Sequence, residues 1–177
     1  LPDGIGIVWA AKWLKNPLRE RVTGSDLVPM IAREAASRRW KLFFLGAEAG
    51  VADRAAQILG ERHPQLKVVG AHAASPHPDD DDESIRLIRQ AQPDILFVAY
   101  GAPAQDKWIQ RNRARVGVSV MMGVGGSFDF ISGVAARAPR WIQNIGLEWL
   151  HRLIQQPWRW KRMLALPRFV IAVTRDK

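Results

Sequence analysis

The sequence predicts a domain of the α/β class, in which a mostly parallel sheet lies between two layers of helices. Three observations predict this architecture. Four short apolar runs begin about 25 residues apart. Amphipathic helix patterns separate these runs, and strands that alternate with helices of this length indicate right-handed βαβ units. Glycines follow three of the four apolar runs, at the ends where a parallel sheet opens toward a ligand.

The four apolar runs are predicted to be strands. They are nearly continuous in apolar residues, which is typical of strands buried on both faces of a parallel sheet. They cover residues 41–46, 66–73, 94–101 and 118–126.

Four helices are expected around these strands. The first is predicted to begin with Ser25 as its N-cap, because a serine oxygen can accept a hydrogen bond from a free backbone N–H of the first turn. Another places acidic residues in its first turn, where the helix dipole favours negative charge. The predicted helices cover residues 24–37, 51–62, 81–91 and 104–115.

The C-terminal segment breaks this alternation. Apolar residues at helical spacing predict a helix over 141–156, which Pro157 ends. Residues 137–177 hold nine Arg and Lys against two acids, and they hold four of the eight tryptophans. The remaining residues hold seventeen basic and fifteen acidic side chains. We therefore expect an α/β body over 1–136 and a basic, Trp-rich helical appendage over 137–177.

The appendage is expected to bind a negative surface, namely anionic lipid, nucleic acid or a phosphorylated ligand. Its longest apolar run is far below the roughly 20 residues that span a bilayer, so it would lie on a membrane. Arg152, Arg159 and Arg162 fall near one helical face, and guanidinium groups bind phosphates bidentately. The alternative interpretation is a solvated basic surface that covers an apolar seam.

The glycines at the strand ends predict a ligand-binding edge. Gly46, Gly101 and the glycines of the stretch "GVGGSF" (123–128) follow separate strands. Small residues in such a turn let backbone N–H groups approach a phosphate or a sugar, although a tight strand-to-helix corner explains them equally well. No lysine follows these glycines, which disfavours a P-loop.

Two polar side chains accompany this predicted edge. Gln105 opens a helix after a strand, and its amide suits a sugar hydroxyl or a uracil edge, although an ordinary first helical turn is the simpler interpretation. Asp3 precedes a short apolar helix pattern. From the residues alone, a helix cap is favoured over a general base for Asp3.

Several classes of site are disfavoured. The chain has no cysteine, and its four histidines lack metal-ligand or triad spacing. The acidic run over 79–82 is expected to be a solvated surface run at a helix start, so no metal site is predicted there. The chain lacks a dinucleotide-binding fingerprint, which counts against a nicotinamide-linked oxidoreductase. A non-enzymatic nucleic-acid-binding module that uses the cationic appendage is the main alternative to an enzyme.

Six segments, in order along the whole chain, resemble the WecG/TagA/CpsF family of bacterial glycosyltransferases. The segments are "PDGIGIVW", "RERVTGSDL", "FFLGA", "ILFVAYGAPAQDKWI", "GVGGSFDFISG" and "RAPRWIQNIGLEWLHRLIQQPWRWKRM". The resemblance implies a Rossmann-like body. It also implies transfer of a hexosyl group, N-acetylmannosamine above all, from a UDP-sugar to a sugar linked to a polyprenyl diphosphate. Such inverting, metal-independent transfer without a cofactor would serve the synthesis of teichoic acid or another cell-surface polysaccharide.

The resemblance also implies roles for individual residues. Asp3 matches the proposed catalytic base, and Gln105 and Arg21 match polar positions of the pocket. The glycines Gly101, Gly125 and Gly126 match the nucleotide-side edge. The arginines of the appendage, Arg152, Arg159 and Arg162, match those thought to meet the diphosphate at the membrane.

The implied partners are the UDP-sugar, the lipid-linked acceptor and a membrane surface, without nucleic acid, and a homo-oligomer is compatible with the family. The implied location is cytoplasmic, peripheral on the inner face of the bacterial plasma membrane. Family members carry a strand and a helix before "PDG", and the 177 residues are expected to lack this segment.

Overall fold

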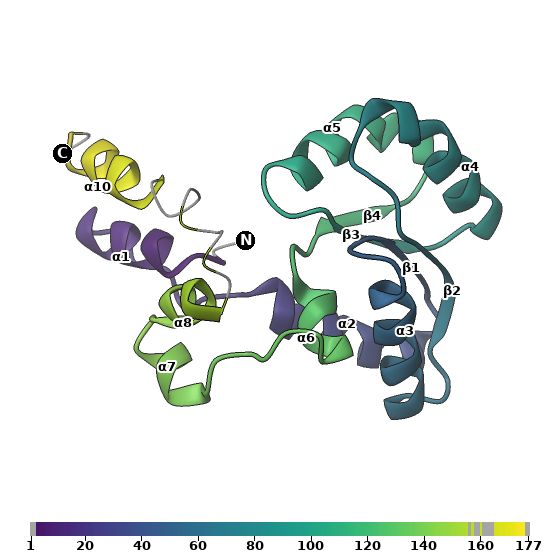
Figure 1. Ribbon diagram of the computed structural model, residues 1–177, viewed down its shortest axis with the longest axis horizontal. Helices are drawn as coiled ribbons and strands as arrows, with labels where there is room; N and C mark the ends of the chain where they lie inside the picture. The colour runs from purple at the N-terminus through teal and green to yellow at the C-terminus, as the bar shows by residue number, and fades with distance from the viewer. Residues whose placement is uncertain (1–2, 156, 158–159, 161–164, 176–177) are drawn as a thin grey trace. The chain divides into compact units, whose positions relative to one another are not determined.

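The computed structural model describes residues 3–155, 157, 160 and 165–175. Contacts divide the chain into two compact units. We call residues 24–135 the sheet unit, and residues 1–23 together with 136–177 the helical unit (Figure 1). Residues 1–23 were expected to belong to the α/β body, whereas the contacts group them with the C-terminal segment.

The sheet unit has the predicted α/β architecture. Its four strands are all parallel and lie in the order β2-β1-β3-β4. Each strand falls within a predicted apolar run and is equal to it or shorter, because only the central residues of a run pair with a neighbour. The strands are β1 (Lys41–Gly46), β2 (Lys67–His72), β3 (Ile95–Ala99) and β4 (Val120–Gly123).

Helices cover both faces of this sheet, which confirms the three layers (Figure 1). Successive side chains of a strand point to opposite faces. Leu42 and Phe44 of β1 therefore pack with three helices on one face, and Phe43 and Leu45 with two helices on the other. The first group is α2 (Gly24–Arg38), α3 (Val51–Arg62) and α6 (Ser127–Ser132), and the second is α4 (Asp81–Ala91) and α5 (Ala104–Val116).

The predicted helices of the sheet unit are confirmed within about one residue at each end. The N-cap prediction for Ser25 is wrong, because α2 begins at Gly24 and places Ser25 inside its first turn. Gly24 has little room for a side chain, since a Cβ there would lie 3.1 Å from Ser127 Oγ and from the Val124 carbonyl oxygen. The start of α2 is therefore fixed by packing against the turn after β4.

The helical unit contains four described helices, α1 (Ile5–Trp13), α7 (Arg140–Asn144), α8 (Glu148–Gln155) and α10 (Ala165–Arg175). Helices α1 and α10 lie side by side. None of the described helices is both long enough and apolar enough to cross a bilayer.

The single helix predicted over 141–156 is divided into α7 and α8. Gly146 interrupts it with a φ of +78°, a backbone conformation that residues with a Cβ rarely adopt. A Cβ at this position would also lie 2.7 Å from Cγ1 of Ile5. The apolar spacing continues across the break, which is why periodicity alone predicts one helix.

Candidate active site

The β4–α6 turn forms one part of the candidate site. β4 ends at Gly123, and residues 124–126 connect it to the buried start of α6. The turn is fixed at its beginning, because the Val124 N–H donates to the Val98 carbonyl at 2.9 Å. It is fixed at its end by the Ser127 N–H, which donates to the Val124 carbonyl at 3.2 Å. The turn therefore lies at the carboxyl end of the sheet, where the glycine pattern predicts the ligand.

Gln105 is the side chain that holds this turn. It lies in the first turn of α5, is 8% exposed, and accepts a hydrogen bond at Oε1 from the Gly125 N–H at 2.9 Å. The strand order explains the pairing, since α5 follows β3 and β3 is the neighbour of β4. The structure thus brings two predicted site residues together. It gives Gln105 a structural role in the turn, and its contact with a substrate stays a prediction.

The backbone of Gly123 closes against the Gln105 side chain. A Cβ at Gly123 would lie 2.5 Å from Gln105 Nε2 and 2.7 Å from its Cδ, which is closer than real Cβ atoms approach. A side chain at this position would displace Gln105 and break its bond to Gly125. Gly123 is therefore required by the close approach of a buried amide.

Gly123→Ala is expected to lower the free energy of unfolding by roughly 1–3 kcal/mol, the usual cost of overpacking. It should also speed the hydrogen exchange of the Gly125 amide, because that amide loses its acceptor. Gly60→Ala is the control, since Gly60 lies in α3 with open space around its Cα and alanine favours a helix. Urea unfolding and amide exchange measure the effect. Equal stability of the two variants would contradict this account of Gly123.

The other predicted polar residues belong to the helical unit. Asp3 is exposed and stands just before α1, and the N-cap of that helix is Gly4, which makes no side-chain cap hydrogen bond. The capping interpretation of Asp3 therefore does not place it at the N-cap position. Asp3 does have an interaction of its own. Its role as a base stays a prediction.

Arg21 is paired with an acidic residue that the sequence patterns did not single out. Its Nη2 donates to Oε2 of Glu148 at 2.7 Å, and both side chains are only 18% exposed. Arg137 Nε donates to the other carboxylate oxygen at 3.3 Å, and Arg137 Nη2 donates to Thr23 Oγ1 at 3.4 Å. Glu148 therefore joins the segment before the sheet unit to the segment after it. A signal was available, since Glu148 is the only acid between residues 137 and 175.

The predicted arginines of the appendage are described only in part. Arg159 and Arg162 lie outside the described residues, as does the side chain of Arg152, whose backbone belongs to α8. The predicted diphosphate contacts of these three arginines stay predictions. The predicted site residues thus belong to both units, with Gly101, Gln105, Gly125 and Gly126 in the sheet unit and the others in the helical unit.

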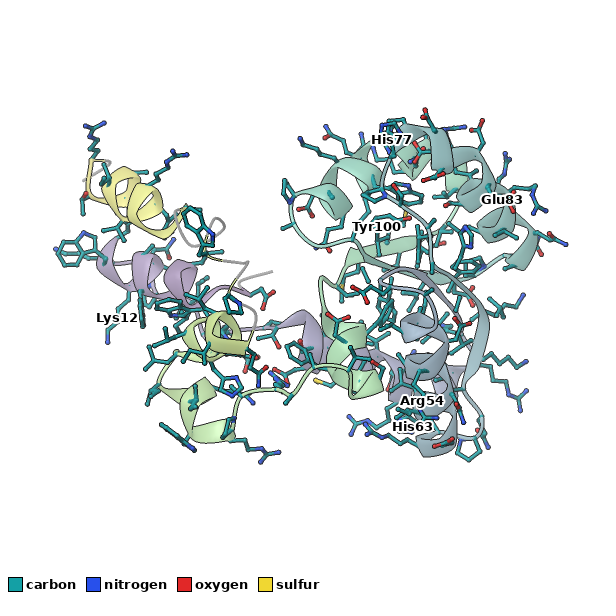
Figure 2. The ribbon with its side chains drawn as sticks, in the orientation of Figure 1. Lys12, Arg54, His63, His77, Glu83 and Tyr100 are labelled. Atoms are coloured by element: carbon teal, nitrogen blue, oxygen red, sulfur yellow. The ribbon has the colours of Figure 1, made fainter. Side chains whose placement is uncertain are left out.

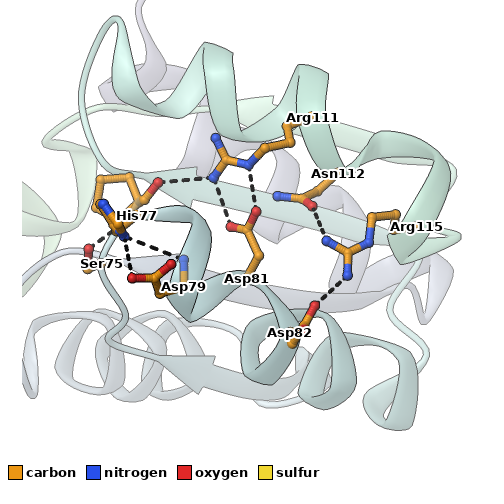
Figure 3. A network of polar contacts seen from close by, with 9 residues as sticks. Ser75, His77, Asp79, Asp81, Asp82, Arg111, Asn112 and Arg115 are labelled. Atoms are coloured by element: carbon orange, nitrogen blue, oxygen red, sulfur yellow. Dashed lines mark hydrogen bonds and ion pairs between the residues drawn. The ribbon is translucent and has the colours of Figure 1, made fainter.

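The acidic run over 79–82 is only partly the solvated surface run expected from the sequence. Asp79 and Asp82 are exposed, but Asp81 is 1% exposed and makes two hydrogen bonds with Arg111 of α5 (Figure 3). Its neighbour Asp82 pairs with Arg115 at the surface. In the described part of the chain, no group of three or more His, Asp or Glu side chains is placed to hold a metal ion.

Burial and pairing act in opposite directions on Asp81. Burial by itself would raise the pKa of this carboxyl, but the hydrogen bonds and the charge of Arg111 outweigh it and hold the pKa below its ordinary value. Burial raises the pKa of the Tyr100 hydroxyl in the same layer (Figure 2). This cluster joins α4 to α5, so it supports the helix whose first turn carries Gln105.

Comparison with known proteins decides which family this arrangement represents. The model of the glycosyl transferase WecG/TagA/CpsF family matches residues 1–177. The chain belongs to this family. The resemblance found in the sequence is thereby confirmed for the whole chain.

Several curated relatives carry the name N-acetylglucosaminyldiphosphoundecaprenol N-acetyl-beta-D-mannosaminyltransferase. The chain is 36% identical over 177 residues to the protein of that name from Bacillus subtilis (strain 168) and 35% identical to the one from Bacillus spizizenii. It is 32% identical over 176 residues to the one from Staphylococcus aureus (strain MW2). Each match covers 99% or more of this chain and 68% of the relative.

Proposed function

We propose that this chain transfers N-acetylmannosamine from a UDP-linked donor to N-acetylglucosaminyl-diphospho-undecaprenol. The observation that carries the proposal is the whole-chain similarity to relatives named for this transfer. It also makes the nucleic-acid-binding alternative unnecessary as an explanation of the basic C-terminal segment. In this proposal, the product serves the synthesis of teichoic acid or a related surface polymer.

The proposed reaction is a single displacement. The acceptor hydroxyl is a poor nucleophile, so Asp3 accepts its proton as the oxygen attacks the anomeric carbon. A bond forms between the acceptor oxygen and that carbon, while the bond from the carbon to the UDP oxygen breaks. Attack from the side opposite UDP inverts the configuration of the sugar. The exposure of Asp3 is compatible with this role, because the acceptor needs direct access to the carboxylate.

Negative charge develops on the leaving UDP and requires stabilisation. The turn at Gly125 and Gly126 is proposed to contact the nucleotide side, in a shape that the hydrogen bond from the Gly125 N–H to Gln105 Oε1 fixes. Arg21 lies near the surface of the helical unit beside Glu148 and Arg137, where a diphosphate could compete with the carboxylate. We further propose that Arg152, Arg159 and Arg162 bind the diphosphate, so that cationic side chains supply the charge without a metal ion.

The proposed location is the inner face of the bacterial plasma membrane, where both a nucleotide sugar and a lipid-linked acceptor are available. The distribution of charge supports it. The helical unit holds thirteen basic and four acidic side chains, whereas the sheet unit holds thirteen of each. All of the net charge of +9 therefore belongs to the helical unit, which suits binding to an anionic surface.

A donor screen tests the proposed function. The purified protein is offered several UDP-sugars with the lipid-diphosphate acceptor in detergent, and release of UDP is followed. UDP-N-acetylmannosamine is expected to give release only when the acceptor is present, and EDTA should leave the rate unchanged. Release with a different UDP-sugar alone would replace the donor assignment. No release with any donor, together with tight binding to oligonucleotides, would favour the nucleic-acid alternative.

A further inference from the structure

An apolar groove lies between α1, α8 and α10 of the helical unit. Its volume is about 390 Å³, which falls in the range of roughly 300–1,000 Å³ typical of small-molecule sites. Helices α1 and α10 contribute most of the lining, and Trp149 of α8 completes it. The principal apolar side chains are Ile5, Trp9, Trp13, Phe169, Val170 and Val173.

The lining selects a hydrocarbon. It contains no charged residue, and its one hydroxyl, on Thr174, already donates within α10 to the carbonyls of Val170 and Ile171 at 3.1 and 2.9 Å. Apart from Thr174, the polar side-chain groups of the lining are the indole N–H groups of its three tryptophans, so a polar ligand would lose its hydration there and gain few partners. Apolar groups, by contrast, gain free energy in proportion to the surface that they remove from water.

The groove is open to a ligand in the described structure. Trp9 is 55% exposed, Trp13 56% and Val170 58%. Of the sixteen large apolar side chains found exposed among the described residues, thirteen belong to the helical unit. Exposed apolar patches of this kind mark sites where a ligand, a membrane or a partner binds.

Charge and chain position narrow the choice of occupant. The helical unit carries the whole net charge of +9, so it favours a hydrocarbon that is attached to a negative group. Lys12 extends from α1 into solvent on this unit (Figure 2). Asp3 precedes the first lining residue, Ile5, by two positions, which limits their Cα separation to about 7 Å. One end of the groove therefore lies close to the proposed catalytic base.

We propose that this groove binds the polyprenyl chain of the acceptor over the isoprene units next to its diphosphate. The inference rests on the acceptor assigned under the proposed function. The chain lies along α1 and α10, which directs the diphosphate and its sugar toward Asp3. Helix α1 thus becomes part of the acceptor site, although it precedes the basic C-terminal segment by more than a hundred residues.

Binding of isoprenoid diphosphates tests the groove directly, without a donor and without turnover. Isothermal titration compares geranyl diphosphate, farnesyl diphosphate, inorganic diphosphate and the single-chain phospholipid lysophosphatidylglycerol. The Kd is expected to fall by about tenfold or more from the geranyl to the farnesyl compound, because five further carbons enter the groove. An unchanged Kd across the series, or equally tight binding of the phospholipid, would overturn the proposal.

Two adjacent substitutions locate the binding. Val170→Asp places a carboxylate in the groove, whereas the control Ile171→Asp places it on a neighbouring residue of similar exposure, 52%, that does not line the groove. Val170→Asp should weaken farnesyl diphosphate binding by about tenfold or more, and Ile171→Asp by less than about twofold. Equal effects of the two substitutions would contradict the assignment. Ala10→Phe, which fills the groove without adding charge, should repeat the result if Val170→Asp fails to fold.

These experiments test the proposed groove and the proposed reaction separately. Chain-length-dependent binding without sugar transfer would keep the groove and reject the acceptor reaction. If the protein transfers the sugar but the Kd for isoprenoid diphosphates does not depend on chain length, the proposed reaction is kept and the proposed groove is rejected. The remaining possible occupant of the groove is a second copy of the chain, and light scattering would detect the resulting dimer. A dimer that Val170→Asp dissociates would replace the lipid by a protein partner.

Discussion

Asp3→Asn is expected to lower the kcat of sugar transfer by about 10²–10⁴-fold, the usual contribution of a positioned general base. Asparagine has nearly the same shape as aspartate, but its amide cannot accept the proton that the acceptor hydroxyl releases. The KM for the UDP-sugar should change little, since the proposed base acts on the acceptor. Release of UDP under saturating donor and acceptor measures kcat, and far-UV circular dichroism verifies the fold.

The same substitution separates the two interpretations of Asp3. If Asp3 served only the start of α1, Asp3→Asn would change the stability little, because asparagine caps a helix about as well as aspartate, and it would leave kcat unchanged. The structure already places Gly4 at the N-cap position. Glu20→Gln is a matched control, because Glu20 is an exposed carboxylate of the same segment to which no role in the reaction is assigned. Turnover of Asp3→Asn within about tenfold of the wild type would remove Asp3 from the mechanism.

Local patterns in the sequence were sufficient to predict the layers of the sheet unit. Near-continuous apolar runs such as residues 41–46 identify strands buried on both faces, and the structure covers β1 on both sides. The order of the strands could not be predicted in the same way. The contact between Gln105 and Gly125 depends on β3 lying beside β4, a long-range pairing that leaves no periodic signal.

The features of the helical unit that the sequence did not predict have a similar cause. Gly146 breaks the predicted helix through its positive φ, and Ile5, which is far away in the sequence, occupies the space that a Cβ would need there. No sequence pattern connected Arg21 with Glu148, yet the two residues form an ion pair across 127 positions. Spacing and composition describe each segment by itself. They do not show that residues 1–23 fold together with the C-terminal segment.

Asp81 shows how composition can also mislead. Four consecutive aspartates predict a solvated run, but helix geometry turns one of them inward. The Asp81 carboxylate accepts from Arg111 Nε at 2.5 Å and from Nη2 at 2.9 Å, and Arg111 Nη2 also donates to the Pro76 carbonyl at 3.1 Å. The pair therefore joins α4, α5 and the loop before α4 (Figure 3). Asp82 also pairs with α5, through Arg115, but it is exposed, so burial distinguishes Asp81 from its neighbours.

Asp81→Asn is expected to lower the free energy of unfolding by roughly 1–3 kcal/mol, because the buried position loses its charge-assisted hydrogen bonds to Arg111, whose own side chain is 34% exposed to water. Asp82→Asn is the matched control. It removes the same charge one residue later from a pair in which Asp82 is 86% exposed, so it should cost less than about 1 kcal/mol. Urea unfolding at neutral pH, followed by far-UV circular dichroism, measures both. Equal losses would show that the Asp81 pair contributes no more than a surface pair.

The pH dependence of unfolding provides a second readout of the Asp81 pair. The folded pKa of Asp81 lies below the ordinary value of 3.8, so between the two values the unfolded chain binds more protons than the folded chain. The stability from this pair is therefore fully present above the ordinary carboxyl pKa, and it is lost as the pH falls through the folded pKa. The wild type should lose stability over this acidic range more steeply than Asp81→Asn, in which residue 81 cannot titrate. Parallel pH profiles would show that Asp81 is not held in its charged form by Arg111, and α5 would then need another support for the turn that Gln105 holds.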